Sequence, residues 1–157
     1  MRLTQFSDYA IRVMLYLAAH TERLNSISEI ADAHEISRSH LMKVVSKLAA
    51  QGYIESVQGR NGGIRLGNPA TEINIGQLIR HTEGHINLIE CSQCKLNGVC
   101  KLPGPLDLAL AAFYFVLDSY SLADVQGAQE ATVLALALTG GVRPVAPSGN
   151  PPLFNRT

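Results

Sequence analysis

Residues 26–66, with the sequence SISEIADAHEISRSHLMKVVSKLAAQGYIESVQGRNGGIRL, decide the fold. Ser26 and Glu29 have the S-x-x-E spacing of a capping box, which predicts a short helix that ends near His34. After a three-residue connection, Ser37 predicts the cap of a second helix, whose apolar residues recur at helical spacing. Two short helices joined by a tight turn are typical of a helix-turn-helix.

The chain changes to a strand-like pattern after Gly52. Residues 53–57 and 64–66 are short runs rich in β-forming side chains, and the six residues between them include three glycines and an asparagine. This pattern predicts a two-stranded β hairpin with a glycine-rich tip. A hairpin that directly follows a helix-turn-helix predicts a winged helix, with Arg60 and Asn61 on the wing.

The flanking segments complete a mainly α-helical fold. A helix is predicted over residues 7–20, after Thr4 or Ser7 as its cap, and a short helix begins after Asn74. From Leu106 a long helix is apolar nearly all round, so it requires cover on every side. It is either a central core helix or, as we favour, a dimerisation helix packed against a second copy. The predicted regions are a winged-helix DNA-binding domain (1–70), a linker helix with a cysteine loop (71–103), a dimerisation region with a further short helix at 131–138 (104–138), and a disordered proline-rich tail (139–157).

The distribution of charge points to DNA. The chain has 13 Lys and Arg against 13 Asp and Glu, so a promiscuous polyanion binder is excluded. Between residues 36 and 66, however, five cations accompany one acid, Glu55. Taken alone, such cations are usually a solvated face, and the glycines also suit a plain tight hairpin. Together with the fold they predict DNA contacts by Arg38, Ser39, His40, Lys43 and Lys47 of the second helix and by Arg60, Asn61, Gly62, Gly63 and Arg65 of the wing.

Several other classes of protein do not fit the sequence. The longest apolar run, residues 108–117, is half the length needed to cross a bilayer, and the N-terminus lacks the pattern of a signal peptide. We therefore expect a cytoplasmic protein without a membrane span. The chain has no paired acid and base carboxylates, nucleophile elbow or phosphate-binding loop, so an enzyme is not expected.

The three cysteines of the chain lie within ten residues. Cys91, Cys94 and Cys100 have the spacing C-x2-C-x5-C, and three thiolates this close can converge on one soft metal centre. A four-coordinate centre then needs one further ligand. We favour an iron–sulfur cluster, while structural zinc, a thiol redox pair and plain structural cysteines are the alternatives.

Four separate motifs carry a resemblance to a known family. LTQFSDYAIR (3–12), ISRSHLMKV (36–44), GRNGGIRL (59–66) and LAD (122–124) resemble the NsrR-like nitric-oxide-sensing repressors, which belong to the winged-helix iron–sulfur regulators that also include IscR. The resemblance implies a homodimeric repressor with one cluster per subunit, 4Fe-4S being favoured over 2Fe-2S. Nitrosylation of the cluster would release the operator of nitric oxide detoxification genes.

The same resemblance implies where the remaining cluster ligand lies. The matching residue is Asp8, given by the partner subunit, with Arg12 as its neighbour one turn later; the ordinary interpretation of Asp8 is an acid that favours the helix dipole. The alternatives are an iron–sulfur or redox-responsive regulator of cluster biogenesis, similar to IscR, and a zinc-stabilised winged-helix regulator. IscR-like proteins have a histidine where this chain has Pro103, which disfavours the first of these alternatives. The first cysteine gap is narrower than is usual in the family; His81, His85 and Glu90 are disfavoured substitute ligands.

Overall fold

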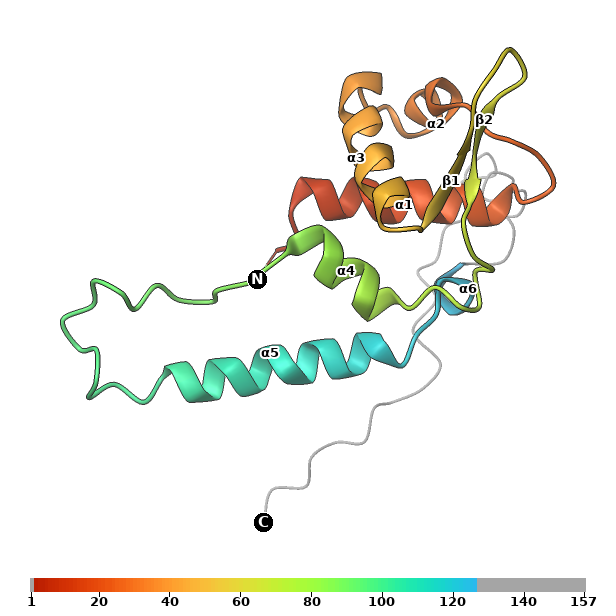
Figure 1. Cartoon of the computed structure of the whole chain (residues 1–157). Helices are drawn as coiled ribbons and strands as arrows, with labels where there is room; N and C mark the ends of the chain where they lie inside the picture. The colour runs from red at the N-terminus through yellow and green to blue at the C-terminus, as the bar shows by residue number, and fades with distance from the viewer. Residues whose placement is uncertain (1, 127–157) are drawn as a thin grey trace, which may run out of the picture. The chain divides into compact units, whose positions relative to one another are not determined.

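Helices α2 (Ile27–His34) and α3 (Arg38–Ala50) form the predicted helix-turn-helix in the computed structural model, which describes residues 2–126 (Figure 1). The capping box of α2 is complete. The Ser26 hydroxyl accepts from the Glu29 amide at 3.1 Å, and the Glu29 carboxylate accepts from the Ser26 amide at 3.1 Å. The local pattern of capping residues therefore fixed the start of α2 where the sequence predicted it.

The wing is an antiparallel hairpin of β1 (Ile54–Val57) and β2 (Gly63–Leu66). At its tip, a β-carbon on Gly62 would overlap the carbonyl oxygen of Val57, so this tight turn requires glycine. At its base, the backbone of Asn25 exchanges two hydrogen bonds with Ile64, at 2.9 and 2.8 Å. The hairpin is thus fastened to the loop that precedes α2.

Helix α1 (Gln5–Ala19) runs through the centre of the core, packed against α3, α4 and the wing (Figure 1). Of the two predicted caps, Thr4 is the one used, since its side chain accepts from the amide of Ser7. The core consists of apolar side chains from every element except α5, among them Met14, Leu17, Ile30, Leu41, Val44, Leu48, Ile64, Leu78 and Leu122. One continuous core therefore holds the helix-turn-helix, the wing and α4 in a fixed arrangement.

Helix α4 (Ile75–Glu83) begins after its predicted cap, Asn74, and lies beside the long helix α5 (Pro103–Asp118) (Figure 1). The sequence predicts the long helix from Leu106, and α5 begins three residues earlier, at Pro103. A proline costs little in the first turn, because the amides there have no partner within the helix.

The C-terminal end of α5 also differs from the prediction. The apolar positions of the helix predicted from Leu106 continue to Tyr120 and Leu122, whereas α5 ends at Asp118 and a second helix, α6 (Leu122–Val125), follows. Ser121 and Asp124 form a capping box that starts α6, and this local signal was present in the sequence. The helix predicted at 131–138 and the tail predicted at 139–157 lie outside the described residues.

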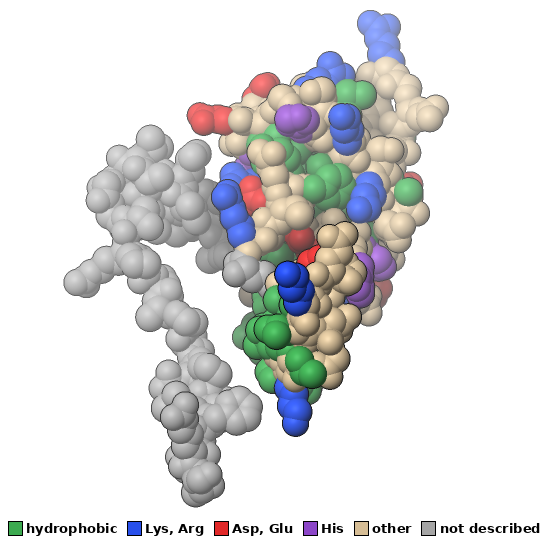
Figure 2. Space-filling model, turned by 90° about the vertical axis from the view of Figure 1, so that its left-hand side faces the viewer, with side chains coloured by type: hydrophobic (Ala, Val, Ile, Leu, Met, Phe, Trp, Pro, Cys, Tyr) green, Lys and Arg blue, Asp and Glu red, His purple; other side chains and the backbone are tan. Residues whose placement is uncertain are grey.

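Helix α5 leaves most of its apolar surface uncovered. None of its residues is buried; Leu108 is 73% exposed and Phe115 is 79% exposed. Figure 2 shows hydrophobic side chains gathered in its lower part, where α5 and the cysteine segment lie. Within the described residues, no helix is both long enough and apolar enough to span a membrane.

Candidate nucleic-acid interface and metal-binding segment

The predicted DNA-contacting face of α3 is open to solvent. Leu41, Val44 and Leu48 are buried against the core, and the opposite side of the helix is exposed. The exposed side carries all five predicted residues of this helix, Arg38, Ser39, His40, Lys43 and Lys47. A recognition helix has this arrangement, with its N-terminal residues available to base edges and its later cations available to phosphates.

Two aromatic residues of α1 contact side chains of this exposed face. The Lys47 ammonium lies 4.8 Å from the centre of the Phe6 ring, and the Tyr9 and His40 rings stack with their centroids 6.4 Å apart. A hollow of about 130 Å³ between α1 and α3 is lined by Gln5, Phe6 and Tyr9 of α1 and by His40, Lys43 and Val44 of α3. Sequence reasoning missed these contacts, because no spacing rule pairs Phe6 and Tyr9 of α1 with side chains of α3.

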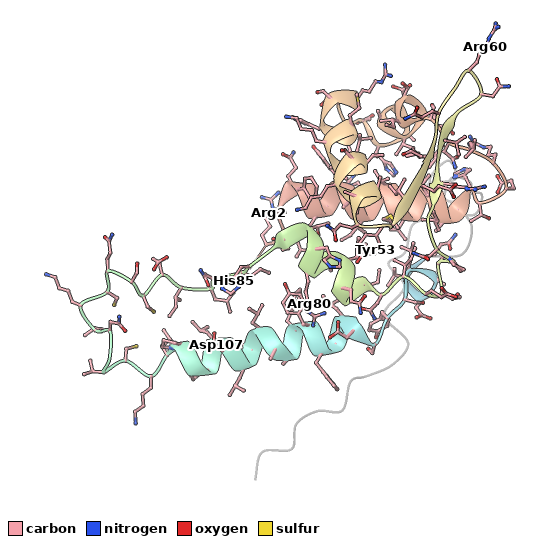
Figure 3. The ribbon with its side chains drawn as sticks, viewed as in Figure 1. Arg2, Tyr53, Arg60, Arg80, His85 and Asp107 are labelled. Atoms are coloured by element: carbon pink, nitrogen blue, oxygen red, sulfur yellow. The ribbon has the colours of Figure 1, made fainter. Side chains whose placement is uncertain are left out.

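The wing places Arg60 at its tip, where the side chain points away from the rest of the molecule (Figure 3). Asn61 beside it is exposed, and Gly62 and Gly63 are half-buried. A cation at the end of a projecting hairpin can reach a groove next to the one that holds the recognition helix.

Arg65, the second predicted wing arginine, is engaged within the hairpin. Its guanidinium donates to both carboxylate oxygens of Glu55, the residue directly opposite on β1, at 2.9 and 3.1 Å. This pairing lowers the pKa of Glu55 and raises the pKa of Arg65. Because the acid neutralises the arginine, the free protein presents one fewer available cation on the wing than the sequence suggested.

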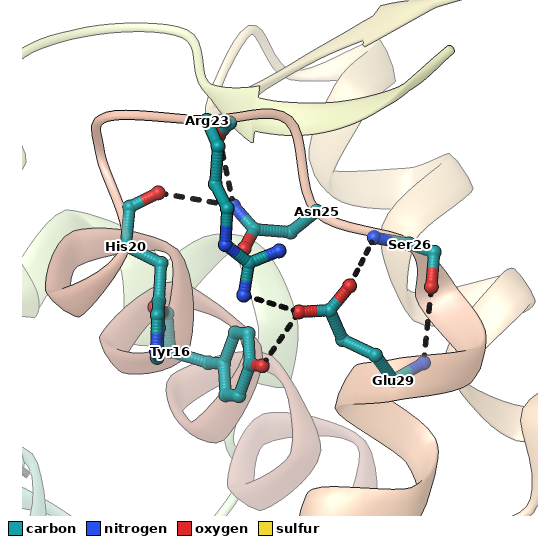
Figure 4. Close-up of polar contacts among 6 residues, drawn as sticks. All are labelled: Tyr16, His20, Arg23, Asn25, Ser26 and Glu29. Atoms are coloured by element: carbon teal, nitrogen blue, oxygen red, sulfur yellow. Dashed lines mark hydrogen bonds and ion pairs between the residues drawn. The ribbon is translucent and has the colours of Figure 1, made fainter. Parts of the chain in front are cut away.

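A polar network fixes the position of α2 relative to α1 (Figure 4). Glu29 accepts from the Tyr16 hydroxyl at 2.8 Å and from Arg23 at 2.5 Å, besides its bond to the Ser26 amide. Hydrogen bonding from Arg23 lowers the pKa of Glu29 to about 2, while burial raises the pKa of Tyr16. The network holds the start of α2, the first helix of the helix-turn-helix, and includes none of the exposed residues of α3.

The three cysteines lie on an exposed segment between α4 and α5. All three are free of disulfides; Cys91 is half-buried, and Cys94 and Cys100 are exposed. Consecutive turns shape the segment, with the Cys94 amide donating to the Cys91 carbonyl at 3.2 Å and the Cys100 amide to the Leu96 carbonyl at 3.0 Å. Across residues 2–126, no three His, Cys, Asp or Glu side chains gather into a group able to hold a metal ion.

Asp8, the predicted additional ligand, lies in the first turn of α1. Its carboxylate accepts from Nε of Arg12 at 3.0 Å, and both side chains are about half exposed. The two residues line a broad polar hollow of about 1000 Å³ that also includes Arg2 and Glu35. The structure thus pairs Asp8 with Arg12. The role of Asp8 as a ligand and that of Arg12 as its neighbour at the cluster stay predictions.

Two of the three disfavoured substitute ligands, His81 and Glu90, make other contacts. His81 Nδ1 is hydrogen-bonded to the Tyr53 hydroxyl at 2.6 Å, and a Glu90 carboxylate oxygen accepts from the Ser92 amide at 2.8 Å. His85 is exposed at the start of the cysteine segment (Figure 3).

Residues 3–128 match the model of the Rrf2 family, described as iron-dependent transcriptional regulators. The chain belongs to the Rrf2 family. It is 47% identical over 131 residues to the HTH-type transcriptional regulator NsrR of Bacillus licheniformis. This match covers 80% of the present chain and 92% of that protein. The NsrR of Bacillus subtilis is 44% identical over the same length, covering 80% and 90%.

Solved structures of Rrf2-like regulators share the fold. CymR, the global cysteine regulator of B. subtilis, superimposes with a TM-score of 0.68 at 29% identity, covering 80% of this chain and 96% of that one. IscR of T. potens gives 0.65 at 25% identity, covering 85% and 96%. The predicted winged-helix fold and the resemblance to NsrR are confirmed. Because Rrf2 proteins are transcriptional regulators, the expectation that the chain is not an enzyme is confirmed as well.

Proposed function

We propose that this chain is a homodimeric, DNA-binding transcriptional repressor that holds an iron–sulfur cluster and responds to nitric oxide. The observation that carries the proposal is the free three-cysteine segment, Cys91 to Cys100, in a winged-helix chain 44–47% identical to regulators named NsrR. The genes it would control are those for nitric oxide detoxification.

The donor set fits an iron–sulfur cluster. Thiolates are the usual ligands of such clusters, and the three thiols here are unpaired and accessible on a segment built from turns. Cys91, Cys94 and Cys100 would hold the cluster, and Asp8 of the partner subunit would complete the set. When bound, the cluster supplies iron that reacts with nitric oxide.

The chain's own residues would link that chemistry to DNA. Thiolates are the ligands that iron–sulfur clusters select, and a carboxylate binds such a cluster more weakly, so Asp8 is the contact we expect to be lost first. Arg12 is already paired with Asp8 and can keep this ion pair once the carboxylate has left the cluster. Loss of the cross-subunit contact would free the two subunits to change their relative orientation.

A fixed dimer orientation matters because two recognition helices must meet successive major grooves, about 34 Å apart. The uncovered apolar side of α5, with Leu108 and Phe115 exposed, supplies a surface on which two copies can pair. The exposed cations of α3 and the wing would then contact one pseudo-palindromic site.

The test uses anaerobically purified full-length protein and a DNA site selected by that protein from a random pool. Iron and sulfide analysis with absorption spectroscopy establishes the cluster, and we expect operator affinity to fall when nitric oxide is added. Iron-free protein given the same nitric oxide is the control. Unchanged affinity of the loaded protein contradicts nitric oxide sensing, and absence of iron and sulfide contradicts the cluster.

The ligands are tested one at a time. Cys91→Ala, Cys94→Ala and Cys100→Ala should each give colourless protein with weak operator binding, whereas Ser92→Ala, in the same segment, should keep its colour. A cysteine variant that stays brown removes that residue from the ligand set.

A further inference from the structure

The last turn of α4 contacts three other elements through four consecutive side chains. Arg80 contacts α5, His81 contacts the base of the wing, and Thr82 and Glu83 contact α1. The next residue, Gly84, has a φ of 69° and ends the helix, after which the chain leads into the cysteine segment. The turn therefore lies between the proposed sensor and the elements that such a sensor must move.

Arg80 joins the turn to α5. It donates to both carboxylate oxygens of Asp118, at 2.5 and 2.7 Å, and its guanidinium lies 4.2 Å from the centre of the Tyr114 ring, between the two helices (Figure 3). The pairing lowers the pKa of Asp118. A β-carbon on Gly76 would overlap Asp118, so glycine permits the close approach of α4 to α5.

Thr82 and Glu83 join the turn to α1. The buried Ser7 hydroxyl donates to the Thr82 hydroxyl at 2.7 Å, and Glu83 accepts from the amide and the hydroxyl of Thr4 at 2.7 and 3.0 Å. Partial burial raises the pKa of Glu83, but hydrogen bonding from Ser7 and Thr4 outweighs it and leaves the pKa below its usual value. Both sets of hydrogen bonds hold the cap and first turn of α1, and Asp8 lies in this turn.

His81 joins the turn to the DNA-binding elements. Its Nδ1 and the Tyr53 hydroxyl are hydrogen-bonded at 2.6 Å, and the two rings meet edge to face. Tyr53 is only 8% exposed, and its amide donates to the carbonyl of Leu48, in the last turn of α3, at 3.0 Å. Tyr53 directly precedes β1, so this one side chain sits where the recognition helix, the wing and α4 meet.

The cysteine segment has few other links to the body. Among the described residues, the hydrogen bonds made by residues 85–102 stay within the segment or join its end to the first turn of α5. A change in the segment therefore passes to the body through its two covalent ends, Gly84 after α4 and Pro103 at the start of α5, and Arg80 joins α5 to the last turn of α4.

We infer that the last turn of α4 couples the state of the cysteine segment to the DNA-binding elements, with the His81–Tyr53 hydrogen bond as the positioning contact for α3 and the wing. The inference rests on the proposed function for the nature of the stimulus. Tyr53 and His81 touch neither the DNA nor the cluster in this scheme; they act by setting where α3 and β1 lie relative to α4.

The test compares full-length wild type, Tyr53→Phe, and Tyr120→Phe as the matched control. Phenylalanine keeps the buried ring at position 53 and removes only the hydroxyl, while Tyr120 is an exposed tyrosine after α5. Operator affinity is measured for the iron-loaded and the iron-free form of each protein. Iron content and hydrogen exchange of the wing amides are measured alongside.

We expect Tyr53→Phe to retain the iron content of wild type while the ratio of loaded to iron-free affinity falls about fivefold. Exchange of the wing amides should become the same in its loaded and iron-free forms. Tyr120→Phe should match wild type in both respects. A loss of stability alone would change both forms equally and leave the ratio intact.

The outcomes separate this inference from the proposed function. If wild type responds to the cluster and Tyr53→Phe responds equally, the coupling turn is refuted and the proposed function stands. If wild type holds no cluster, or binds DNA equally well with and without it, both are refuted.

Discussion

Replacing Glu55 with glutamine should strengthen DNA binding by freeing Arg65. The two side chains face each other across the solvent side of the hairpin, and Glu55 accepts two hydrogen bonds from Arg65. While the pair persists, the arginine adds nothing to the positive charge that the wing offers to phosphates. Glutamine is nearly isosteric and uncharged, so the substitution releases the cation without reshaping the strand.

The size of the effect follows from the number of cations facing DNA. Arg38, Lys43, Lys47 and Arg60 are exposed in each subunit, so a dimer offers about eight, and the slope of log affinity against log salt should be about −7. One freed arginine per subunit steepens the slope to about −9. The gain in affinity on lowering salt from 0.3 to 0.1 M should then be roughly sevenfold larger than for wild type.

The assay is a salt titration of operator binding by fluorescence anisotropy. Glu72→Gln is the matched control, since it removes one exposed acid per subunit outside the hairpin. The double variant Glu55→Gln with Arg65→Ala separates lost repulsion from a gained contact. Both side chains of the pair are half exposed, so the thermal unfolding midpoint should stay close to that of wild type. Equal slopes for the Glu55 and Glu72 variants would refute the reasoning.

Three further predictions concern other parts of the molecule. Lys47→Ala should weaken binding evenly across DNA sequences and flatten the salt slope by about one unit per subunit; a change in sequence preference would contradict a phosphate contact. Because the bond from Arg23 lowers the pKa of Glu29 to about 2, this carboxylate stabilises the fold above pH 4.5, and the effect is lost as the pH falls from about 4.5 to 2. Glu29→Gln should therefore lose stability at neutral pH and show a shallower acid dependence of thermal unfolding than wild type or the control Glu22→Gln; an unchanged acid dependence would refute this. Phe115→Ser should raise the dimer dissociation constant at least about tenfold in analytical ultracentrifugation, and an unchanged constant would place the interface elsewhere.

Local features of the fold were predictable from the sequence because their causes are local. Ser26, Ser37 and Asn74 each cap a helix through the amide three residues further on, and such spacings can be read directly. The start of α6 is also marked in the sequence, by the capping box of Ser121 and Asp124. The apolar positions continue past this point, however, and they favour one long helix.

Some features of the site could also have been found from the sequence. Once β1 and β2 are aligned so that Val57 faces Gly63, Glu55 must face Arg65, and their opposite charges predict the pair. The contacts of Glu83 with Thr4 are different, since 79 residues separate them and no spacing rule connects them. They follow from the packing of α4 against α1, which only the three-dimensional arrangement shows.

The narrow gap between Cys91 and Cys94 bears on how the proposed cluster would be held. The Cys94 amide donates to the Cys91 carbonyl, so the two residues are the ends of one tight turn, and Cys100 lies two further turns along. Two thiolates on one turn can contact the same centre with little rearrangement, whereas Cys100 must be brought in by movement of the chain between them. That chain contains Gly98 with a φ of 90°, a conformation that favours glycine, and it ends next to the first turn of α5. Binding and release of the Cys100 thiolate would therefore displace the start of α5. Binding of the Cys91 and Cys94 thiolates would displace the end of α4, through Glu90 and Gly84. The ion pair of Arg80 and Asp118 joins α4 to α5, so both displacements act on the same pair of helices. A small change at the cysteines can therefore shift α4 relative to the wing.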